Sequence, residues 1–462
     1  MERPSETKAY LSAVLEQIRY KKVHDELSRE IEAHILDQKE AYMAQGMDPE
    51  EAEKKAVAQM GDPVLVGTEL DRIYRPRPEW SIIALTAALL LFGLIIRHFA
   101  DVQAARDLAS SDLKVSSLAL GQFLGSLAAG SWQVLFIALG LGLMALIYFI
   151  DFTILGRYSR SIFFSLSLLA VLAAGYLPLI FGHDQHLLYI LMLFPIAFAG
   201  VVFRMRGKGY WGVLLCGVCL AIPSTIAFIM SLNSVTFLLP FKASFLILWV
   251  TGPVLLTVAI WKNWFGSNRL FSMLLIYVLL HLGLAGAMIR VWDGLKIAAA
   301  DSPMDDFARI IKQLLSGARF IGQGTFNDIY PAGMMLPAIE SDFLLTYAIH
   351  RFGWIIFLVA ASLLVAFIAA AFSKCLRLKS VLAQLVSLSV VLNFTMQTIL
   401  YILFNLGLAS ASPLPLPLIS RGNGFILVNL CLIGVLLSTF RTGRFVSDPP
   451  RAKRHVKPWV TG

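Results

Sequence analysis

The chain has 462 residues, of which 57% are hydrophobic and only 15% are charged. A soluble protein with so few polar side chains could not cover its surface, so the composition excludes a soluble globular class and indicates a polytopic membrane protein. The formal net charge is +9, but residues 1–79 carry 17 acids against 12 Lys or Arg. The basic excess therefore belongs to the membrane part and does not indicate nucleic-acid binding.

Residues 1–79 are predicted to form a small cytoplasmic helical domain. Its first half repeats apolar residues at helical spacing, at Val23, Leu27, Ile31 and Ile35. After Gly46, a second helix is expected to begin with Asp48 as its cap and Pro49 in its first turn, and a third to follow Pro63. The run from Asp48 to Pro63 resembles the helical prefix domain found ahead of some bacterial permeases. That resemblance implies regulation or protein contact; a folded cap without a partner is the alternative.

Ten segments are long and apolar enough to span a bilayer, which takes about 20 residues. They lie near 80–97, 125–150, 161–182, 186–204, 210–232, 241–261, 270–289, 349–372, 380–408 and 424–440. The loops on one side are much richer in Lys and Arg, so the positive-inside rule places both termini in the cytoplasm. The predicted fold is all-α: about ten transmembrane helices over residues 80–445, followed by a basic cytoplasmic tail, 446–462.

Acidic residues avoid these predicted spans and gather in one large outer loop, residues 291–341. Between Trp80 and Val446 there are only twelve Asp or Glu, and seven of them fall between the seventh and eighth predicted spans. A carboxylate inside a bilayer is costly and marks an ion or proton path. The lack of one in the predicted spans argues against proton-coupled transport. Asp342, the last acid before the eighth span, is the candidate for carboxylate chemistry at the outer rim.

Within this loop, Ser302-Pro303-Met304-Asp305 predicts the start of an amphipathic helix that Gly317 ends. Its apolar face consists of Phe307, Ile310, Ile311, Leu314 and Leu315. We expect the helix to lie along the bilayer surface, where it would line a groove for a lipid substrate. Gly322-Gln323-Gly324 follows and by itself predicts only a flexible turn.

Two motifs carry a resemblance to a known family. Gly322-Gln323-Gly324 and then Leu336-Pro-Ala-Ile-Glu-Ser-Asp-Phe343 are similar to the loop of the FtsW/RodA/SpoVE (SEDS) family, which has a glycine-rich turn followed by LPExHTDF. Further on, Gln397, Gly407 and Pro415-Leu-Pro-Leu-Ile-Ser-Arg-Gly422 resemble the family's Q…GLLPVTGxPLPFISYGG at gapless spacing. The resemblance covers roughly residues 80–445, and its motifs lie within 290–440.

The chain also departs from the family pattern. The family's Glu and His become Ala338 and Glu340, and the Glu-Glu that usually follows the aspartate is replaced by His350-Arg351. Tyr-Gly-Gly becomes Arg421-Gly422-Asn423. These departures keep open a second interpretation, a non-catalytic relative that binds or flips lipid-linked precursor and scaffolds division partners.

What the resemblance implies is a peptidoglycan glycosyltransferase of the bacterial plasma membrane, serving cell division or cell shape. It would polymerise lipid-linked disaccharide (lipid II) at the outer face, with Asp342, which matches the family's essential aspartate, as the base that activates the attacking hydroxyl. A class B penicillin-binding transpeptidase is the implied membrane partner, and magnesium or manganese the implied cofactor, although this loop shows no dedicated cation cage.

The leaving pyrophosphate requires positive charge, which Arg290, Lys296, Arg319 or Arg421 is expected to supply. Gln397 and Ser420 are expected to line the cavity as neutral hydrogen-bond partners of the substrate. The alternatives are that Gln397 makes an interhelical hydrogen bond and that Ser420 only caps the last span.

Overall fold

The computed structural model describes residues 6–110, 117–181, 185–232, 239–278, 303–325, 341–408 and 414–445. Every regular element in these ranges is a helix. The chain divides into two compact units, each described by itself below. One contains residues 1–78 and 441–448, and the other contains residues 79–440 and 449–462.

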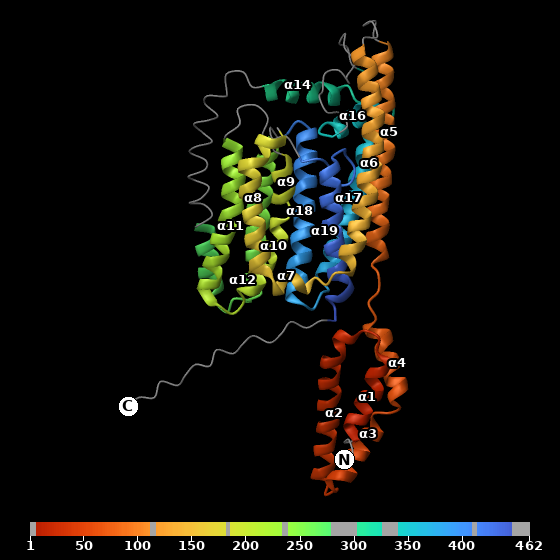
Figure 1. Ribbon diagram of the computed structural model, residues 1–462, viewed down its shortest axis with the longest axis vertical. Helices are drawn as coiled ribbons and strands as arrows, with labels where there is room; N and C mark the ends of the chain where they lie inside the picture. The colour runs from red at the N-terminus through yellow and green to blue at the C-terminus, as the bar shows by residue number, and fades with distance from the viewer. Residues whose placement is uncertain are drawn as a thin grey trace, which may run out of the picture. The chain divides into compact units, whose positions relative to one another are not determined.

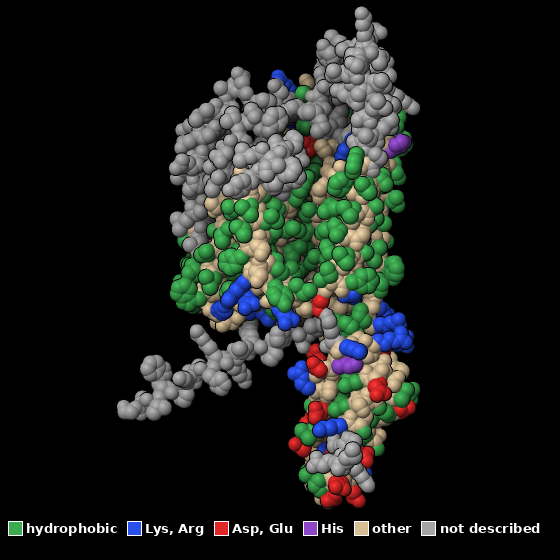
Figure 2. Space-filling view, viewed as in Figure 1, with side chains coloured by type: hydrophobic (Ala, Val, Ile, Leu, Met, Phe, Trp, Pro, Cys, Tyr) green, Lys and Arg blue, Asp and Glu red, His purple; other side chains and the backbone are tan. Residues whose placement is uncertain are grey.

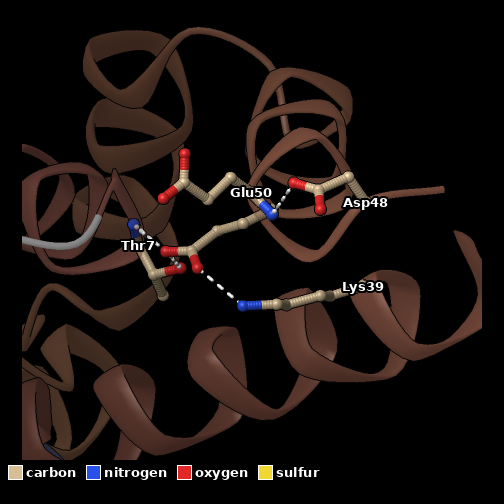
Figure 3. A network of polar contacts seen from close by, with 5 residues as sticks. Thr7, Lys39, Asp48 and Glu50 are labelled. Atoms are coloured by element: carbon tan, nitrogen blue, oxygen red, sulfur yellow. Dashed lines mark hydrogen bonds and ion pairs between the residues drawn. The ribbon is translucent and has the colours of Figure 1, made fainter. Parts of the chain in front are cut away.

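The first unit contains four α-helices (Figure 1): α1 (Glu6–Gln17), α2 (His24–Ala44), α3 (Pro49–Gln59) and α4 (Pro63–Tyr74). The predicted helix starts are confirmed. The Asp48 carboxylate accepts the Glu50 N–H at 3.1 Å (Figure 3), and the Asp62 carboxylate caps α4 in the same way by accepting the Val64 N–H at 2.9 Å. Proline follows each cap, where its missing N–H is not needed.

The core of this unit forms between the apolar faces of its helices. The residues predicted from spacing are buried, and Leu27, Ile31 and Ile35 of α2 pack with residues of α1. A polar network ties three helices together (Figure 3), in which Glu53 of α3 accepts the Thr7 hydroxyl at 2.9 Å and the Lys39 ammonium at 2.7 Å.

A residue that follows the last helix of the chain, α19, also packs on this core. Phe445 packs against it, and its ring lies 5.6 Å from the ring of Tyr74. The predicted membrane domain extended to residue 445. Residues 441–445 instead group with the first unit, because Phe445 finds its apolar partners there.

The second unit is a bundle of apolar helices. Their bounds are α5 (Trp80–Ser110), α6 (Ser117–Phe149), α7 (Thr153–Arg157), α8 (Ser159–Phe181), α9 (Gln185–Leu191), α10 (Phe194–Arg204), α11 (Gly209–Leu232), α12 (Leu239–Trp261), α14 (Pro303–Ser316), α16 (Leu344–Phe352), α17 (Trp354–Cys375), α18 (Val381–Asn405) and α19 (Asn423–Thr442).

In the described part of the chain, eight helices are long and apolar enough to cross a membrane, and two shorter apolar helices cover Ser159–Gly175 and Arg269–Val278. Each of the ten predicted spans therefore overlaps an apolar helix. The predicted polytopic all-α fold is confirmed. Helices α18 and α19 lie in the middle of the bundle (Figure 1), with 67% and 72% of their spanning windows buried. These are the helices that bound the second family-like motif.

Lys and Arg side chains gather at one end of the bundle, while hydrophobic side chains cover its flank (Figure 2). Contacts join the loops that the positive-inside rule assigns to the inner face. Arg204 donates to the Arg157 carbonyl at 3.3 Å, Lys262 donates to the Gln384 side chain at 2.7 Å, and Lys374 pairs with Glu79. The predicted inner loops thus lie together at one end.

The predicted eighth span, 349–372, is wrong in its start. It consists of a short helix α16 and a separate spanning helix α17 that begins at Trp354. Gly353 separates them with φ +95°, a conformation that favours glycine. A Cβ at Gly353 would lie 2.4 Å from the Phe320 carbonyl oxygen, so the packed segment 319–320 also excludes a side chain here.

Candidate functional site

Asp342 lies immediately ahead of α16, outside the candidate membrane spans. Helix α16 is buried from Leu344 to His350, so the aspartate is attached to a rigid, fully packed element. The prediction placed Asp342 shortly before the eighth span, which was expected to begin at residue 349. In the structure a separate short helix, α16, lies between Asp342 and the spanning helix, because Gly353 ends α16 before α17 begins.

Asn405, the last residue of α18, fixes the backbone around Asp342. Its amide nitrogen donates to the Asp342 carbonyl at 2.9 Å, and its side-chain oxygen accepts the Thr346 N–H at 3.0 Å. The Thr346 hydroxyl in turn donates to the Asn405 carbonyl at 2.9 Å. This exchange satisfies free backbone groups of the first turn of α16 and ties that turn to α18.

Tyr401, one turn earlier on α18, connects Asp342 to the last motif. Its buried hydroxyl donates to the Ser341 carbonyl at 2.9 Å. The Ser420 side chain and the Asp342 carboxyl both lie near the same hydroxyl. Ser420 is itself buried, and its hydroxyl is 3.3 Å from the Leu416 carbonyl. Tyr401 thus binds the residue before Asp342 and lies near Ser420.

A buried cation, Arg97 of α5, reaches the same cluster. Its side chain is only 2% exposed, and it donates to the Gly93 carbonyl at 2.9 Å and to the Ser420 carbonyl at 3.2 Å. A buried guanidinium is costly unless it is hydrogen-bonded. Its location beside Ser420 therefore places positive charge in the group of residues that contains the Asp342 carboxyl.

The backbone beside Ser420 is strained. Leu418 has φ +64°, a region that branched and bulky residues rarely adopt. A Cβ at Gly93 would lie 2.7 Å from Ile419 Cα, so α5 can approach this segment only because position 93 has no side chain. Strained residues persist where the surroundings hold them, and they concentrate at functional sites.

The carboxyl of Asp342 has a perturbed acidity. Burial raises its pKa from 3.8 to about 6, although a hydrogen bond from the Ser341 side chain opposes the rise. Desolvation disfavours the charged carboxylate, which explains the direction. A carboxyl whose pKa lies near the working pH is suited to accept a proton in one step and release it in the next.

The Gly322-Gln323-Gly324 segment is fixed by hydrogen bonds to the end of α16, whereas the sequence predicted only a flexible turn. The Gly322 and Gly324 N–H groups donate to the Phe352 and His350 carbonyls at 3.0 and 2.7 Å. A Cβ at Gly324 would lie 2.8 Å from the His350 ring. Gly324 is needed because a side chain there would meet the His350 ring, whereas Gly322 is needed for its φ of +90°.

Helix α14 is confirmed with the predicted bounds, from Pro303 to Ser316. It lies across one end of the bundle (Figure 1). Its buried residues Ile311 and Leu314 pack with Phe343 and Phe404. At least this part of the apolar face is therefore covered by protein, where we had expected the bilayer surface.

The residues predicted to bind substrate are distributed unevenly. Ser420 belongs to the cluster around Asp342, and half-buried Arg421 follows it directly. Arg319 is exposed on the segment after α14, where its carbonyl accepts the Trp354 N–H at 3.0 Å. Arg290 and Lys296 lie outside the described residues.

Gln397 is fully buried, and its amide nitrogen lies 3.6 Å from the Met192 sulfur. This contact matches the alternative stated for it, an interhelical hydrogen bond. Asn393, one turn away on α18, donates to the Met192 carbonyl at 2.9 Å. The two side chains thus face the break between α9 and α10, and substrate binding by Gln397 stays a prediction.

Sequence reasoning did not identify Arg97, Tyr401 or Asn405. A signal was available for Arg97, since an arginine inside a predicted span is expensive and marks a functional site. Tyr401 and Asn405 lie at the end of a span near Gln397, where only the fold brings them to Asp342. His350, which replaces a family glutamate, is buried with its ring 3.1 Å from the Leu314 carbonyl.

The expected divalent cation stays a prediction. In the described ranges no three His, Cys, Asp or Glu residues are grouped as metal ligands. Hard cations such as magnesium require several oxygen ligands. The described side chains alone therefore do not supply such a ligand set.

No family model matches the chain, and no curated protein matches it. Among solved structures, it is similar to a chain from work described as structural coordination of polymerization and crosslinking by a peptidoglycan synthase complex. That match has 14% identity and a TM-score of 0.51, and covers 79% of this chain and 98% of the other.

Two crystal structures of the Thermus thermophilus rod shape determining protein RodA also match, one of them a point mutant. Their TM-scores are 0.48 and 0.49, at 15% and 14% identity, over 79% of this chain. At such identities the likeness shows the fold alone, and it rests on the first structure. The expected resemblance is confirmed at that level.

Proposed function

We propose that this protein is a divergent member of the SEDS family and a peptidoglycan glycosyltransferase of the bacterial plasma membrane. The fold shared with a chain of a peptidoglycan synthase complex and the motifs around Asp342 and Ser420 support family membership. The observation that carries the activity is the half-buried, desolvated Asp342 carboxyl, which lies near Tyr401 and Ser420, the residue whose carbonyl Arg97 also contacts.

In the proposed reaction, a sugar hydroxyl of one lipid-linked disaccharide attacks the anomeric carbon of another. The Asp342 carboxylate accepts the hydroxyl proton as the new C–O bond forms. The bond between the anomeric carbon and the pyrophosphate oxygen breaks, and the electron pair leaves with the polyprenyl pyrophosphate. A pKa of about 6 keeps most of the carboxyl ionised, and so able to accept a proton, at neutral pH.

Positive charge near the leaving group would stabilise the pyrophosphate as its charge develops. Two described arginines lie next to Ser420. Arg421 follows it in the chain, and Arg97 donates a hydrogen bond to its carbonyl. Arg97 is held in place by two carbonyls, so its orientation costs little at the moment of reaction. Arg421 is the residue that replaces the family's tyrosine, and it supplies a charge that the family pattern lacks there.

Polymerisation of fluorescent lipid II by the purified full-length protein tests this proposal, with a class B penicillin-binding transpeptidase added in a parallel reaction. The matched pair of variants is Asp342→Asn and Asp37→Asn, the latter at an exposed carboxylate of α2. Polymer from wild type and Asp37→Asn, but not from Asp342→Asn, supports the proposal. Polymer that Asp342→Asn leaves unchanged removes this residue from the base role.

The second candidate is a non-catalytic relative that binds lipid-linked precursor. The specific observation in its favour is His350, which occupies a family glutamate position yet is buried and bonded to α14. Binding of lipid II to the wild type without any polymer, with or without the transpeptidase, would identify this function.

A further inference from the structure

A cavity at the end of α4 has no part in the proposed reaction. It has a volume of about 400 Å³ and is lined by Thr68, Asp71, Arg72, Arg75, Pro76, Arg77 and Pro78. Three of these seven residues carry a guanidinium group, and all three arginines are exposed. The cavity lies wholly within the first compact unit.

The charge of this cavity is uncompensated. Its one acid, Asp71, already accepts the Arg19 N–H at 2.9 Å and lies 4.0 Å from the Arg19 guanidinium. For Arg72, Arg75 and Arg77 the described residues provide no ion pair. Three like charges at one site repel each other, and an anion between them would relieve that repulsion.

The backbone presents these arginines in a fixed arrangement. Arg72 lies in the last turn of α4, and Arg75 follows in an extended conformation with φ −67° and ψ 121°. Pro76 and Pro78 restrict φ at their own positions and keep the residues before them extended. Arg77 folds back so that its guanidinium lies 3.5 Å from the Arg72 carbonyl. Little backbone freedom is therefore lost when such a site binds a ligand.

The position of the cavity along the chain indicates the source of the anion. Helix α5, a candidate membrane span, begins at Trp80, two residues after Pro78. Two residues reach at most about 7 Å, so the cavity lies close to the lipid headgroups. Trp80 is 71% exposed in the bundle, as suits a side chain at the membrane interface.

We propose that this cavity binds the phosphate of an anionic membrane lipid through the guanidinium groups of Arg72, Arg75 and Arg77. Guanidinium forks match phosphate oxygens with paired hydrogen bonds, whereas a lysine offers only a point charge. Such a site fixes the end of α4 at the headgroup layer. The inference is independent of the catalytic role proposed for Asp342.

The alternative is that these arginines only set the orientation of α5 across the membrane, a role for which any positive charge suffices. A triple variant, Arg72→Lys with Arg75→Lys and Arg77→Lys, separates the two ideas because it keeps the net charge and removes the forked donors. The three side chains are exposed, so the variant is expected to fold. Arg75→Lys alone serves as a milder version.

The test uses the full-length protein in nanodiscs of phosphatidylcholine with or without phosphatidylglycerol. Native mass spectrometry counts retained phosphatidylglycerol, and labelling with phenylglyoxal reports the accessibility of each arginine. We expect phosphatidylglycerol to protect Arg72, Arg75 and Arg77 but not the exposed Arg29 of α2. We expect the triple variant to retain the lipid about tenfold more weakly.

Equal retention by wild type and triple variant would overturn the proposal, because charge alone would then explain binding. Equal protection of Arg29 would also overturn it, since a general surface potential would be responsible. A third arm adds inorganic phosphate to phosphatidylcholine nanodiscs. Full protection there would assign the cavity to free phosphate and refute a lipid ligand.

Discussion

Replacing Asp342 by asparagine should stabilise the protein while it removes the proposed base. The side chain keeps nearly the same shape and loses its charge. The pKa of the carboxyl is raised from 3.8 to about 6 by burial. A difference of about 2.2 pKa units, at ~1.36 kcal/mol per unit, gives about 3 kcal/mol as the cost of holding the carboxylate in the folded protein.

The pH dependence of this effect has a defined sign. The folded pKa is higher than the unfolded one, so the associated stability is fully present below the unfolded value near 3.8 and is lost as the pH rises through about 6. The amide that replaces the carboxyl is neutral at every pH. The gain from Asp342→Asn should therefore reach about 3 kcal/mol at about pH 8 and shrink towards zero at about pH 4.

Thermal unfolding of the purified full-length protein at several pH values measures this gain. Asp37→Asn is the control and should change stability by no more than about 0.5 kcal/mol, because its carboxylate is exposed on α2. A destabilised Asp342→Asn at high pH, or a gain that does not depend on pH, would refute the reasoning. The carboxylate would then be paired in the folded state rather than desolvated.

Three further predictions concern the same region. The pH profile of kcat/KM for polymerisation should rise through about pH 6 and level off above it, because the base form of Asp342 is required; a flat profile there would contradict this. Gly353→Ala should destabilise by about 3 kcal/mol in denaturant or thermal unfolding, since φ is +95° and the new Cβ would meet the Phe320 carbonyl; Gly46→Ala, with φ +90° and open space, should cost less. Asn405→Ala should destabilise the protein by about 3 kcal/mol in the same assay and lower activity, because it leaves the Thr346 N–H and the Asp342 carbonyl unpaired. An unchanged melting temperature would show that these two hydrogen bonds do not hold α16 to α18.

Much of the architecture follows from local signals in the sequence. Hydrophobic runs located the spans, and short-range chemistry set the helix starts, as with Asp48 and Asp62. The break at Gly353 was not predicted, because one glycine within an apolar run is tolerated in a helix. Only its contact with segment 319–320 makes the break necessary.

The site could be predicted in part, for a similar physical reason. Asp342 and Ser420 were selected from the sequence because they lie in motifs. The location of Arg97 within a predicted span was a signal, but its link to Ser420 could not be predicted because the two residues are 323 positions apart in the chain. The Tyr401 hydroxyl likewise donates to the Ser341 carbonyl, which is 60 residues away in the chain. Neighbours in space that are so far apart in sequence leave no periodicity or spacing to detect.

The packing of Phe445 against the core near Tyr74 has a consequence for biogenesis. The ribosome makes the amino-terminal helices first, yet one of their apolar partners emerges only after the last transmembrane segment. During translation the apolar surface near Tyr74 therefore lacks this partner until Phe445 has been made, and it is exposed in the meantime. A reporter protein fused directly after the last span would interfere with the packing of Phe445 on the first unit, whose helices are synthesised hundreds of residues earlier.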